Sequence, residues 1–403
     1  MQLEPKITYE VLLYLDGALI GNVRRIAQNL SWVKNRTRMG VDSIQFTIND
    51  YLLAQWCNER STSVAELLRP LALECRVIRN GVPVVGGFLA TMPAYAAQGQ
   101  SANITLKFDG YLNLLANVYL HPQSTNKGRM GTLIQKWITE ANERASIAGK
   151  AFGFKAGNIA SLPSVEQSIE NYTAIKDIIT NRCDNITGAG PFEVYFHPDK
   201  TYDVVADADF GNAITDYIVQ YPMQLNGVSA TSMSAKEITG YASTIIGIGS
   251  GDVGSGELEK PAPISIQTNS EAVERYGYAE TALSESSVSV QETLERNVAT
   301  ELNNRSTMVW QPEIKLTGRQ VNPIPSGSSK IWIGDTIKLQ NNSDLTEMTS
   351  GDFRVNTLSV SVDANNAEEI TPTLSRGEAI NTNSFFKDFV RMKNELLALK
   401  TGK

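Results

Sequence analysis

The sequence predicts an α+β fold that is mainly β, and three observations support this prediction. Apolar and polar residues alternate along most of residues 9–108 and again along 308–362, which is typical of half-buried strands. From about residue 119 the apolar period becomes helical. A run of Gly, Ser and Asp at 247–256 interrupts the second strand-rich stretch. A chain of 403 residues with 42% hydrophobic residues can bury a core in each of several domains.

Residues 1–118 are predicted to form a small β-barrel or sandwich. Two hairpin turns are expected, at the Asp-Gly pair that begins with Asp16 and the Asn-Gly pair that begins with Asn80, because both pairs tolerate positive φ. Ser63 and Glu66 form a capping-box pattern, in which each side chain accepts a hydrogen bond from an unpaired backbone N–H group. A short helix is therefore expected to follow Ser63.

Residues 119–220 are predicted to form an α/β domain. Thr132 begins a second capping-box pattern, so a helix is expected to follow it and to end at Gly149. A second helix is expected after Tyr172, and a hairpin with its turn at Pro198 follows.

A second β-barrel is predicted from two pieces of the chain, 221–250 and 305–371. They are separated by an inserted loop and helix domain at 251–304. The helix of this insertion is predicted from apolar residues at every fourth position, which are Leu294, Val298 and Leu302. In the last long strand the apolar phase shifts between Val355 and Leu358, which predicts a β-bulge or a strand that changes layers.

Residues 372–403 are predicted to form a polar linker and a C-terminal helix that begins at Ser384. Its apolar residues are spaced 4, 3, 4 and 3 apart, as in a coiled-coil seam, and they are Phe385, Phe389, Met392, Leu396 and Leu399. A helix this short is marginal in isolation, so it must dock on its own protein, on a symmetry mate or on a partner chain. This seam is the candidate oligomer or partner surface.

Composition excludes several classes of protein. The formal net charge is −7 and no Lys/Arg-dense stripe is present, so tight binding to nucleic acid is not expected. The cysteines Cys57, Cys75 and Cys183 have neither the number nor the spacing of a disulfide or zinc framework. No signal peptide is visible at the start, so folding in a cytoplasm is expected. The uncharged stretch 80–106 contains two prolines and four glycines, so no membrane span is predicted.

No catalytic residue, metal site or cofactor is predicted. His121 and His197 each precede a proline, and neither stands in a ligand-spaced cluster. Gly249–Gly254 satisfies G-x-G-x-x-G, but the prolines Pro261 and Pro263 prevent the helix that a dinucleotide phosphate requires. An exposed flexible loop is therefore expected there.

Two acidic motifs are also predicted to have no metal-binding or catalytic role. Asp207–Gly211 resembles the opening of a calcium loop, but the twelfth position is Ile218, which has no carboxylate, so a solvated loop is predicted. Glu368 and Glu369 are adjacent on an extended segment and point to opposite faces. An exposed strand end is the interpretation preferred over a catalytic pair.

Several segments resemble the hub proteins of phage tail tips and baseplates, the tail-associated, late-control-like hub family. They are Arg79–Pro83 followed by Gly86–Leu89, then Lys107–Leu115, Thr293–Asn303 and Ile333–Ile337. The order of barrel, α/β insert, interrupted second barrel and tail is similar to that family over nearly the whole chain.

This resemblance implies two tube-like barrels per subunit and a structural, non-enzymatic hub without cofactors. Three subunits would form a homotrimeric ring that adapts the sixfold tail tube to a threefold tip and lines the DNA channel. The implied partners are a distal tail or tube protein ring, a tape measure protein and a tip fibre or spike protein, with DNA passing transiently and without specific binding. The implied location is the virion tail tip, after assembly in the bacterial host cytoplasm.

The alternative is a tail-associated carbohydrate-binding or cell-wall-hydrolysing protein. Such a protein needs a cleft with exposed aromatic and carboxylate side chains. The aromatic residues that discriminate between the two functions are Trp32, Trp56, Trp137, Trp310 and Trp332. Each lies in or beside an apolar pattern, so they are predicted mostly to be core residues.

Overall fold

The chain divides into two compact units. The computed structural model describes residues 7–98, 101–121, 127–166, 172–183, 191–222, 227–237, 240–250, 262–285, 288, 290–306, 310–342 and 350–375. The large unit contains the described residues up to Ser234 and those from Glu313 onward. The inserted unit is formed mainly by Ala235–Pro312.

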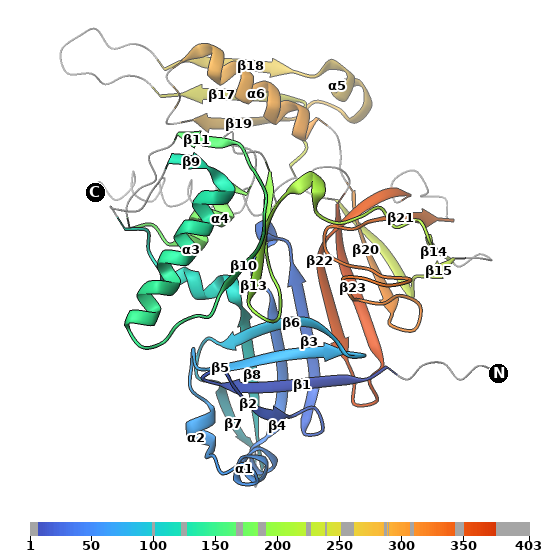
Figure 1. Cartoon of the computed structure of the whole chain (residues 1–403). Helices are drawn as coiled ribbons and strands as arrows, with labels where there is room; N and C mark the ends of the chain where they lie inside the picture. Colours follow the sequence, from blue (N-terminus) through green and yellow to red (C-terminus); the bar gives the residue numbers. More distant parts are fainter. Residues whose placement is uncertain are drawn as a thin grey trace. The chain divides into compact units, whose positions relative to one another are not determined.

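The first strand-rich region of the large unit corresponds to the first predicted barrel (Figure 1). Its strands are β1 (Tyr9–Leu15), β2 (Ala18–Asn22), β3 (Ala27–Asn35), β4 (Ser43–Asn49), β5 (Leu73–Arg79), β6 (Val82–Leu89), β7 (Ala94–Gln98) and β8 (Ser101–Gly110). They pair in the order β3-β4-β8-β6-β5-β1-β2, and β7 pairs with β8. Its short helices are η1 (Thr37–Met39), α1 (Asp50–Asn58), α2 (Val64–Leu67) and η2 (Tyr111–Asn117).

The local signals predicted in this region are confirmed. Asp16 and Asn80 both have positive φ in the turns that follow β1 and β5. Ser63 caps α2 in a complete capping box with Glu66. Helix α1 was not predicted, although its cap residue Asn49 accepts hydrogen bonds from the first turn as a capping asparagine does.

The α/β region follows in the chain and has its own core. Its elements are β9 (Lys127–Arg129), α3 (Met130–Ile147), β10 (Lys155–Ile159), β11 (Ser164–Glu166), α4 (Ile175–Arg182), β12 (Phe192–Phe196), β13 (Thr201–Ala206) and η4 (Asp207–Asp209). Strands β10, β13 and β12 form one sheet, and α3 and α4 contribute to a common apolar core that includes Trp137. Helix α3 begins at Met130, before the predicted cap Thr132, because the fully buried Met130 packs into this core.

The second strand-rich region is built from both sides of the insertion. Its strands are β14 (Val219–Tyr221), β15 (Val228–Ser229), β16 (Ser232–Glu237), β20 (Trp310–Thr317), β21 (Thr336–Asn341), β22 (Gly351–Val362) and β23 (Glu368–Ser375). The prediction that a linker begins at residue 372 is corrected, because strand β23 continues to Ser375. Pro372 lies opposite Leu358 of β22, and it is buried in phase with Ile370 and Leu374, which keeps it in the strand.

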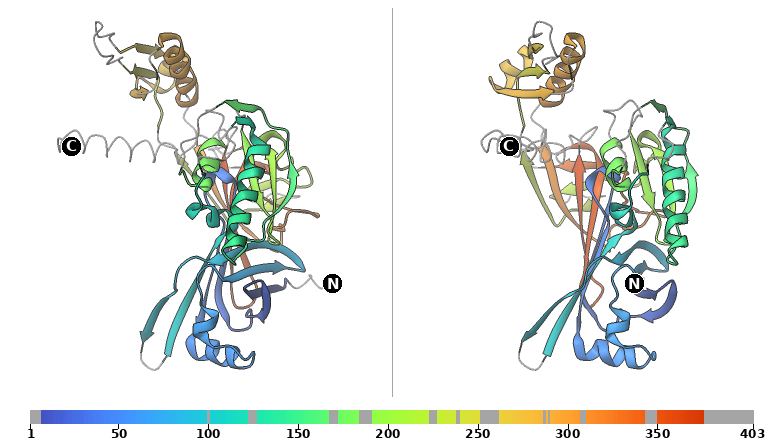
Figure 2. Two further views of the ribbon diagram at one scale, coloured as in Figure 1. Left: turned by 60° about the vertical axis from the view of Figure 1, so that its left-hand side comes forward. Right: turned by 90° about the vertical axis from the view of Figure 1, so that its left-hand side faces the viewer.

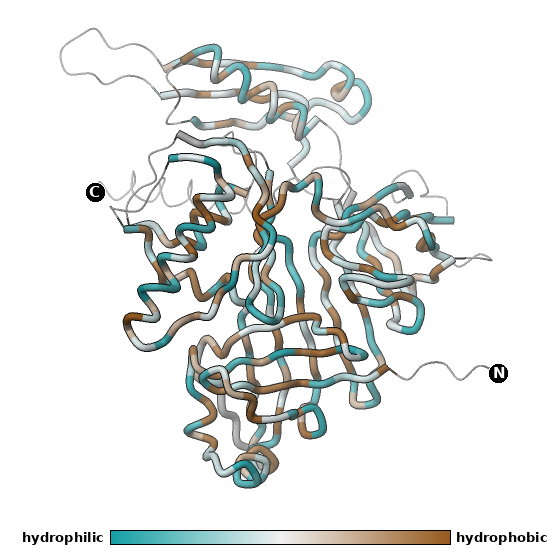
Figure 3. The backbone as a smooth tube through the Cα atoms, in the orientation of Figure 1, coloured by the Kyte–Doolittle hydropathy of each residue, from teal (hydrophilic) through white to brown (hydrophobic). Residues whose placement is uncertain are grey.

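Strand β22 joins the two strand-rich regions into one sheet. Along one edge it pairs first with β21 and then, over Thr357–Val362, with β3. The register against β23 shifts between Val355 and Thr357, which confirms the predicted bulge. The buried hydrophobic residues of both regions form one cluster, in which Trp32 and Trp332 lie 6.3 Å apart between ring centroids. Figure 3 shows apolar and polar residues alternating along these strands.

The inserted unit is a three-stranded sheet with a helix on one face (Figure 2). Its elements are β17 (Thr244–Gly249), β18 (Ile264–Thr268), α5 (Ser270–Tyr276), β19 (Glu280–Glu285) and α6 (Gln291–Arg305). The sheet order is β18-β17-β19. Leu294, Val298 and Leu302 of α6 are buried against Ile245, which confirms the predicted helix.

The α+β, mainly β class is confirmed. The insertion, however, starts near residue 235 and not at 251, because β17 pairs with β18 and β19 of the inserted unit instead of with the large sheet. Within the described residues, none of the helices combines the length and the apolar content needed to cross a membrane. The side chains of Cys57, Cys75 and Cys183 are buried.

Candidate functional site

A largely buried cluster of charged and amide side chains lies where the three regions of the large unit meet. Its members come from the segment after β3, from β12, from η4 and from β22, and they are Arg36, Glu193, Asp207, Arg354 and Asn356. We refer to these five residues as the Arg36 cluster. Arg36 is only 1% exposed, so its charge is stabilised by these neighbours and not by water.

Arg36 binds residues from both of the other regions, two from the α/β region and one from the second strand-rich region. Its Nε donates to Glu193 Oε1 at 2.8 Å, and its Nη1 donates to Asn356 Oδ1 at 3.0 Å. Its Nη2 donates to Asp207. Burial lowers the pKa of the Arg36 guanidinium from its ordinary value, and the nearby Glu193 carboxylate opposes that change.

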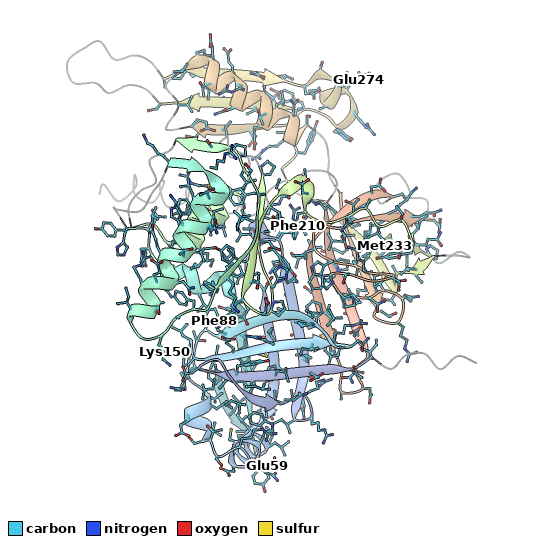
Figure 4. The ribbon with its side chains drawn as sticks, in the orientation of Figure 1. Glu59, Phe88, Lys150, Phe210, Met233 and Glu274 are labelled. Carbon is cyan, nitrogen blue, oxygen red and sulfur yellow. The ribbon has the colours of Figure 1, made fainter. Side chains whose placement is uncertain are left out.

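Arg354 binds the same Asp207 from the second strand-rich region. Its Nη1 donates to Asp207 Oδ2 at 2.8 Å, and its Nη2 donates to the backbone oxygens of Asp207 and Phe210, each at 2.7 Å. Figure 4 shows Phe210 between the α/β region and the second strand-rich region. Because Asn356 is the residue at the bulge of β22, the bulge turns its side chain toward Arg36.

A second buried ion pair connects the two strand-rich regions directly. Arg79, at the end of β5, donates from Nε to Glu368 Oε1 at 2.6 Å and from Nη2 to Glu368 Oε2 at 2.8 Å. Tyr9 of β1 donates its hydroxyl to the same carboxylate, and burial together with the Glu368 charge raises the pKa of Tyr9. A Cβ on Gly318 would lie 1.5 Å from Glu368 Oε2, so a glycine is required at 318.

Two lysine side chains also attach the α/β region to the first strand-rich region. Lys34 of β3 donates to Asp42 Oδ2 at 2.6 Å and to the backbone oxygen of Phe196 at 2.8 Å. Burial lowers the pKa of Lys34, but the charge of Asp42, the nearby Tyr195 and the hydrogen bond to Asp42 together outweigh burial and raise the pKa overall. Lys200, in the turn before β13, forms an ion pair with Glu74 of β5.

These pairs hold the three regions in one arrangement. Breaking a buried ion pair by removing one partner typically costs about 3–5 kcal/mol, because the remaining charge is left buried and unpaired. The carboxylates of the Arg36 cluster and Glu368 are engaged by guanidinium groups, so they are occupied by structure and not free for acid or base catalysis.

Most of these residues have no role predicted from the sequence, and the predictions for two acidic motifs are wrong. Asp207 was expected in a solvated loop, but it is buried and bound by Arg36 and Arg354. Glu368 was expected at an exposed strand end, but it is 6% exposed and bound by Arg79. The expectation that Glu368 and Glu369 point to opposite faces is confirmed, since Glu369 is exposed.

The other candidate residues do not converge on a site. His121 lies at the surface, and His197 Nε2 lies 2.8 Å from Asp203 Oδ2 in an ordinary side-chain pair. Within the described residues no group of three or more His, Cys, Asp or Glu side chains could hold a metal ion. Of the G-x-G-x-x-G motif only Gly249 and Ser250 are described, and Gly249 ends β17.

The tryptophans are core residues wherever their side chains are described. Trp32 and Trp137 are fully buried, and Trp56 and Trp332 are each 6% exposed. The side chain of Trp310 lies outside the description. The candidate C-terminal seam, Phe385, Phe389, Met392, Leu396 and Leu399, lies outside the described residues as well.

The chain has the fold of phage tail proteins. It resembles the 43 kDa tail protein of prophage MuSo2 from Shewanella oneidensis (TM-score 0.58, 11% identity), with coverage of 91% of this chain and 98% of that one. It also resembles a tail protein from Neisseria meningitidis (TM-score 0.56, 12% identity), with 91% and 96% covered. Prophage tail protein gp18 from Listeria monocytogenes is similar too (TM-score 0.52, 12% identity), with 95% and 98% covered. No family model matches the sequence, and no curated protein does.

Proposed function

We propose that this protein is a structural hub of a phage tail tip or baseplate. Three copies form a ring that adapts a sixfold tail tube to a threefold tip and surrounds the channel for DNA. The observation that carries the proposal is the fold match to tail proteins from three organisms, which extends over at least 96% of each of their chains.

The construction of the large unit supports this role. Two strand-rich regions share one sheet through β22 and β3, so each subunit can supply two similar segments to a ring. Buried charges connect these regions, both in the Arg36 cluster and in the ion pair of Arg79 with Glu368. Such connections suit a structural subunit whose regions must keep a fixed arrangement. The net charge of −7 suits a channel wall that does not retain phosphates.

The proposed partners follow from the same role. A distal tail or tube protein ring lies on one side and a tip fibre or spike protein on the other, and the tape measure protein and then DNA pass through the ring. The protein is assembled in the host cytoplasm and acts in the virion tail without catalysing a reaction. The alternative, a carbohydrate-binding or cell-wall-hydrolysing protein, has no comparable support, because the described tryptophan side chains are buried.

The mass of the purified chain in solution tests this proposal. Light scattering after size exclusion, at several concentrations, should give a mass near three times 44.1 kDa, and electron microscopy of that species should show a ring with a central opening. A strict monomer at every concentration, also in the presence of a tail-tube ring, contradicts the proposal.

A further inference from the structure

Among the described residues of the inserted unit, no helix or strand covers one face of the three-stranded sheet. The face toward α6 contains Ile245 and Gly247, whose missing side chain makes room for Val298. The opposite face, which we call the outer face, contains Ile246 and Ile248 of β17. Figure 2 shows α6 against one side of the sheet only.

The four isoleucines of the outer face form two cross-strand pairs. Ile246 lies opposite Ile266, and Ile248 lies opposite Ile264. Ile248, Ile264 and Ile266 are 42%, 58% and 64% exposed. A cluster of exposed aliphatic side chains of this kind marks an interaction surface more often than isolated exposed residues do.

Strand β18 has its alternation reversed relative to the core of the unit. It turns Ser265 and Gln267 toward α6, where Gln267 Nε2 donates to the backbone oxygen of Glu295 at 2.9 Å. It turns Ile264 and Ile266 away from α6. A strand that served only the core of this unit would have the opposite pattern. We therefore infer that Ile264 and Ile266 of β18 contact a surface outside the inserted unit.

The charge of the unit indicates what that contact is. Residues 235–312 contain five basic and eleven acidic residues, a net charge of −6, against −7 for the whole chain. Glu280 lies on the outer face at the edge formed by β19, and Glu271 and Glu274 of α5 follow β18. Anionic lipid and a second acidic copy would both be repelled, whereas a basic border on the partner would be attracted.

The size of the outer face gives a second argument against a free dimer. Three strands about 4.8 Å apart, with about five residues each at about 3.3 Å, make a face of about 240 Å². A stable interface usually needs about 800 Å² from each partner. The contact therefore operates together with other contacts of an assembly.

We propose that the outer face docks onto another protein, one that presents an aliphatic patch bordered by lysine or arginine side chains. The identification of this partner as a tail component rests on the proposed function. The existence of the contact does not depend on that function. The binding assay described next and the mass measurement for the ring can fail independently.

The test uses the full chain and two labelled peptide probes in fluorescence anisotropy. One probe is an amphipathic helix of leucine and lysine, and the other has the same leucines with glutamate in place of lysine. The wild-type chain should bind the lysine probe at least tenfold more tightly than the glutamate probe. The variant with both Ile264→Thr and Ile266→Thr should bind the lysine probe at least tenfold more weakly, while threonine keeps the strand propensity.

The controls separate the outer face from general acidity. Ile147→Thr changes an isoleucine that is 88% exposed at the end of α3 and should leave binding unchanged. Ile266→Lys provides a second variant with a different folding risk and should reverse the preference between the probes. Circular dichroism checks that each variant is folded.

Three results of the peptide assay would overturn the proposal. They are absence of saturable binding by the wild-type chain, equal binding of the lysine probe by the double threonine variant, and equal binding of both probes. Self-association that depends on Ile264 and Ile266 would also overturn it, because the occupant would then be a second copy.

Discussion

Charged side chains stand at inward positions of two strands in the large unit. On β3 and just after it, Lys34 and Arg36 continue the buried phase of Leu30 and Trp32. On β5, Arg79 continues the buried phase of the strand. An inward charge is tolerated only if a partner of opposite charge reaches it, so each of these positions requires a specific neighbour.

The adjacent residues Glu368 and Glu369 give a matched test of this requirement. Glu368→Gln removes the carboxylate charge without creating a cavity and leaves the buried Arg79 guanidinium without its counterion. We expect it to lower the free energy of unfolding by about 3–5 kcal/mol. Glu369→Gln removes the partner of Lys315 at the surface and should cost less than about 1 kcal/mol.

Urea denaturation of both variants measures this difference. The midpoint of Glu368→Gln should fall clearly below that of Glu369→Gln, while both proteins keep the same m value. Equal midpoints would mean that the buried pair does not hold the two regions together.

At the scale of elements, β22 and β17 show how a strand is assigned to a sheet. The bulge at Asn356 lets β22 leave β21 and continue beside β3. Strand β17 was assigned to the second barrel from its apolar sequence, yet α6 and the partners β18 and β19 hold it in the inserted unit. The apolar sequence of a short strand predicts that the strand is buried, but it does not predict which strands and helices cover it.

Gly247 is expected to be essential for packing α6 on β17. A Cβ at this position would lie 2.2 Å from Val298 Cγ2, which a branched side chain cannot relieve by rotating away. We expect Gly247→Ala to destabilise the inserted unit by about 1–3 kcal/mol. Hydrogen exchange of the α6 amides should increase accordingly.

Two further variants check that the cause is steric. Val298→Ala in the Gly247→Ala background should restore part of the lost protection. Ala282→Val adds bulk on the outer face, opposite Ile246, and should leave the α6 amides protected. Loss of protection in the latter variant would mean that the sheet does not tolerate added volume on either side.

At the scale of the whole molecule, the chain is a large unit with a second unit inserted between two paired strands. β16 and β20 flank the insertion and are hydrogen-bonded neighbours, and Thr231 N donates to the backbone oxygen of Lys315 at 2.8 Å. The ends of the insertion therefore leave the large sheet from adjacent strands, which is the arrangement in which an inserted domain is best tolerated.

Replacing residues 238–309 with a short Gly-Ser linker should leave the large unit folded. Its core residues and all of the buried ion pairs described above lie outside the removed segment. Thermal unfolding should remain cooperative with a similar midpoint, and the lysine probe should no longer bind. Aggregation or loss of the cooperative transition would show that the two units depend on one another to fold.

The sequence alone determined the local structure and the class of fold. Local features depend on residues that are neighbours in the chain, so the sequence predicts them directly. They are the hairpin turns at Asp16 and Asn80, the capping box at Ser63 and the bulge near Val355. In the strands of the large unit the alternating pattern likewise indicated which faces are buried, whereas in β18 the isoleucines are the exposed residues. The absence of ligand-spaced motifs directed the interpretation toward a structural protein.

Only the tertiary structure decided which distant segments meet. The partners of Arg36 are 157 to 320 residues away in the chain, and those of Arg79 are 239 to 289 residues away. A charge in the buried phase of a strand indicates that a partner must exist, but sequence spacing does not identify it. The pairing of β22 with β3 and the uncovered outer face were decided at this level for the same reason, because hydrogen bonding and burial between remote strands depend on the whole fold.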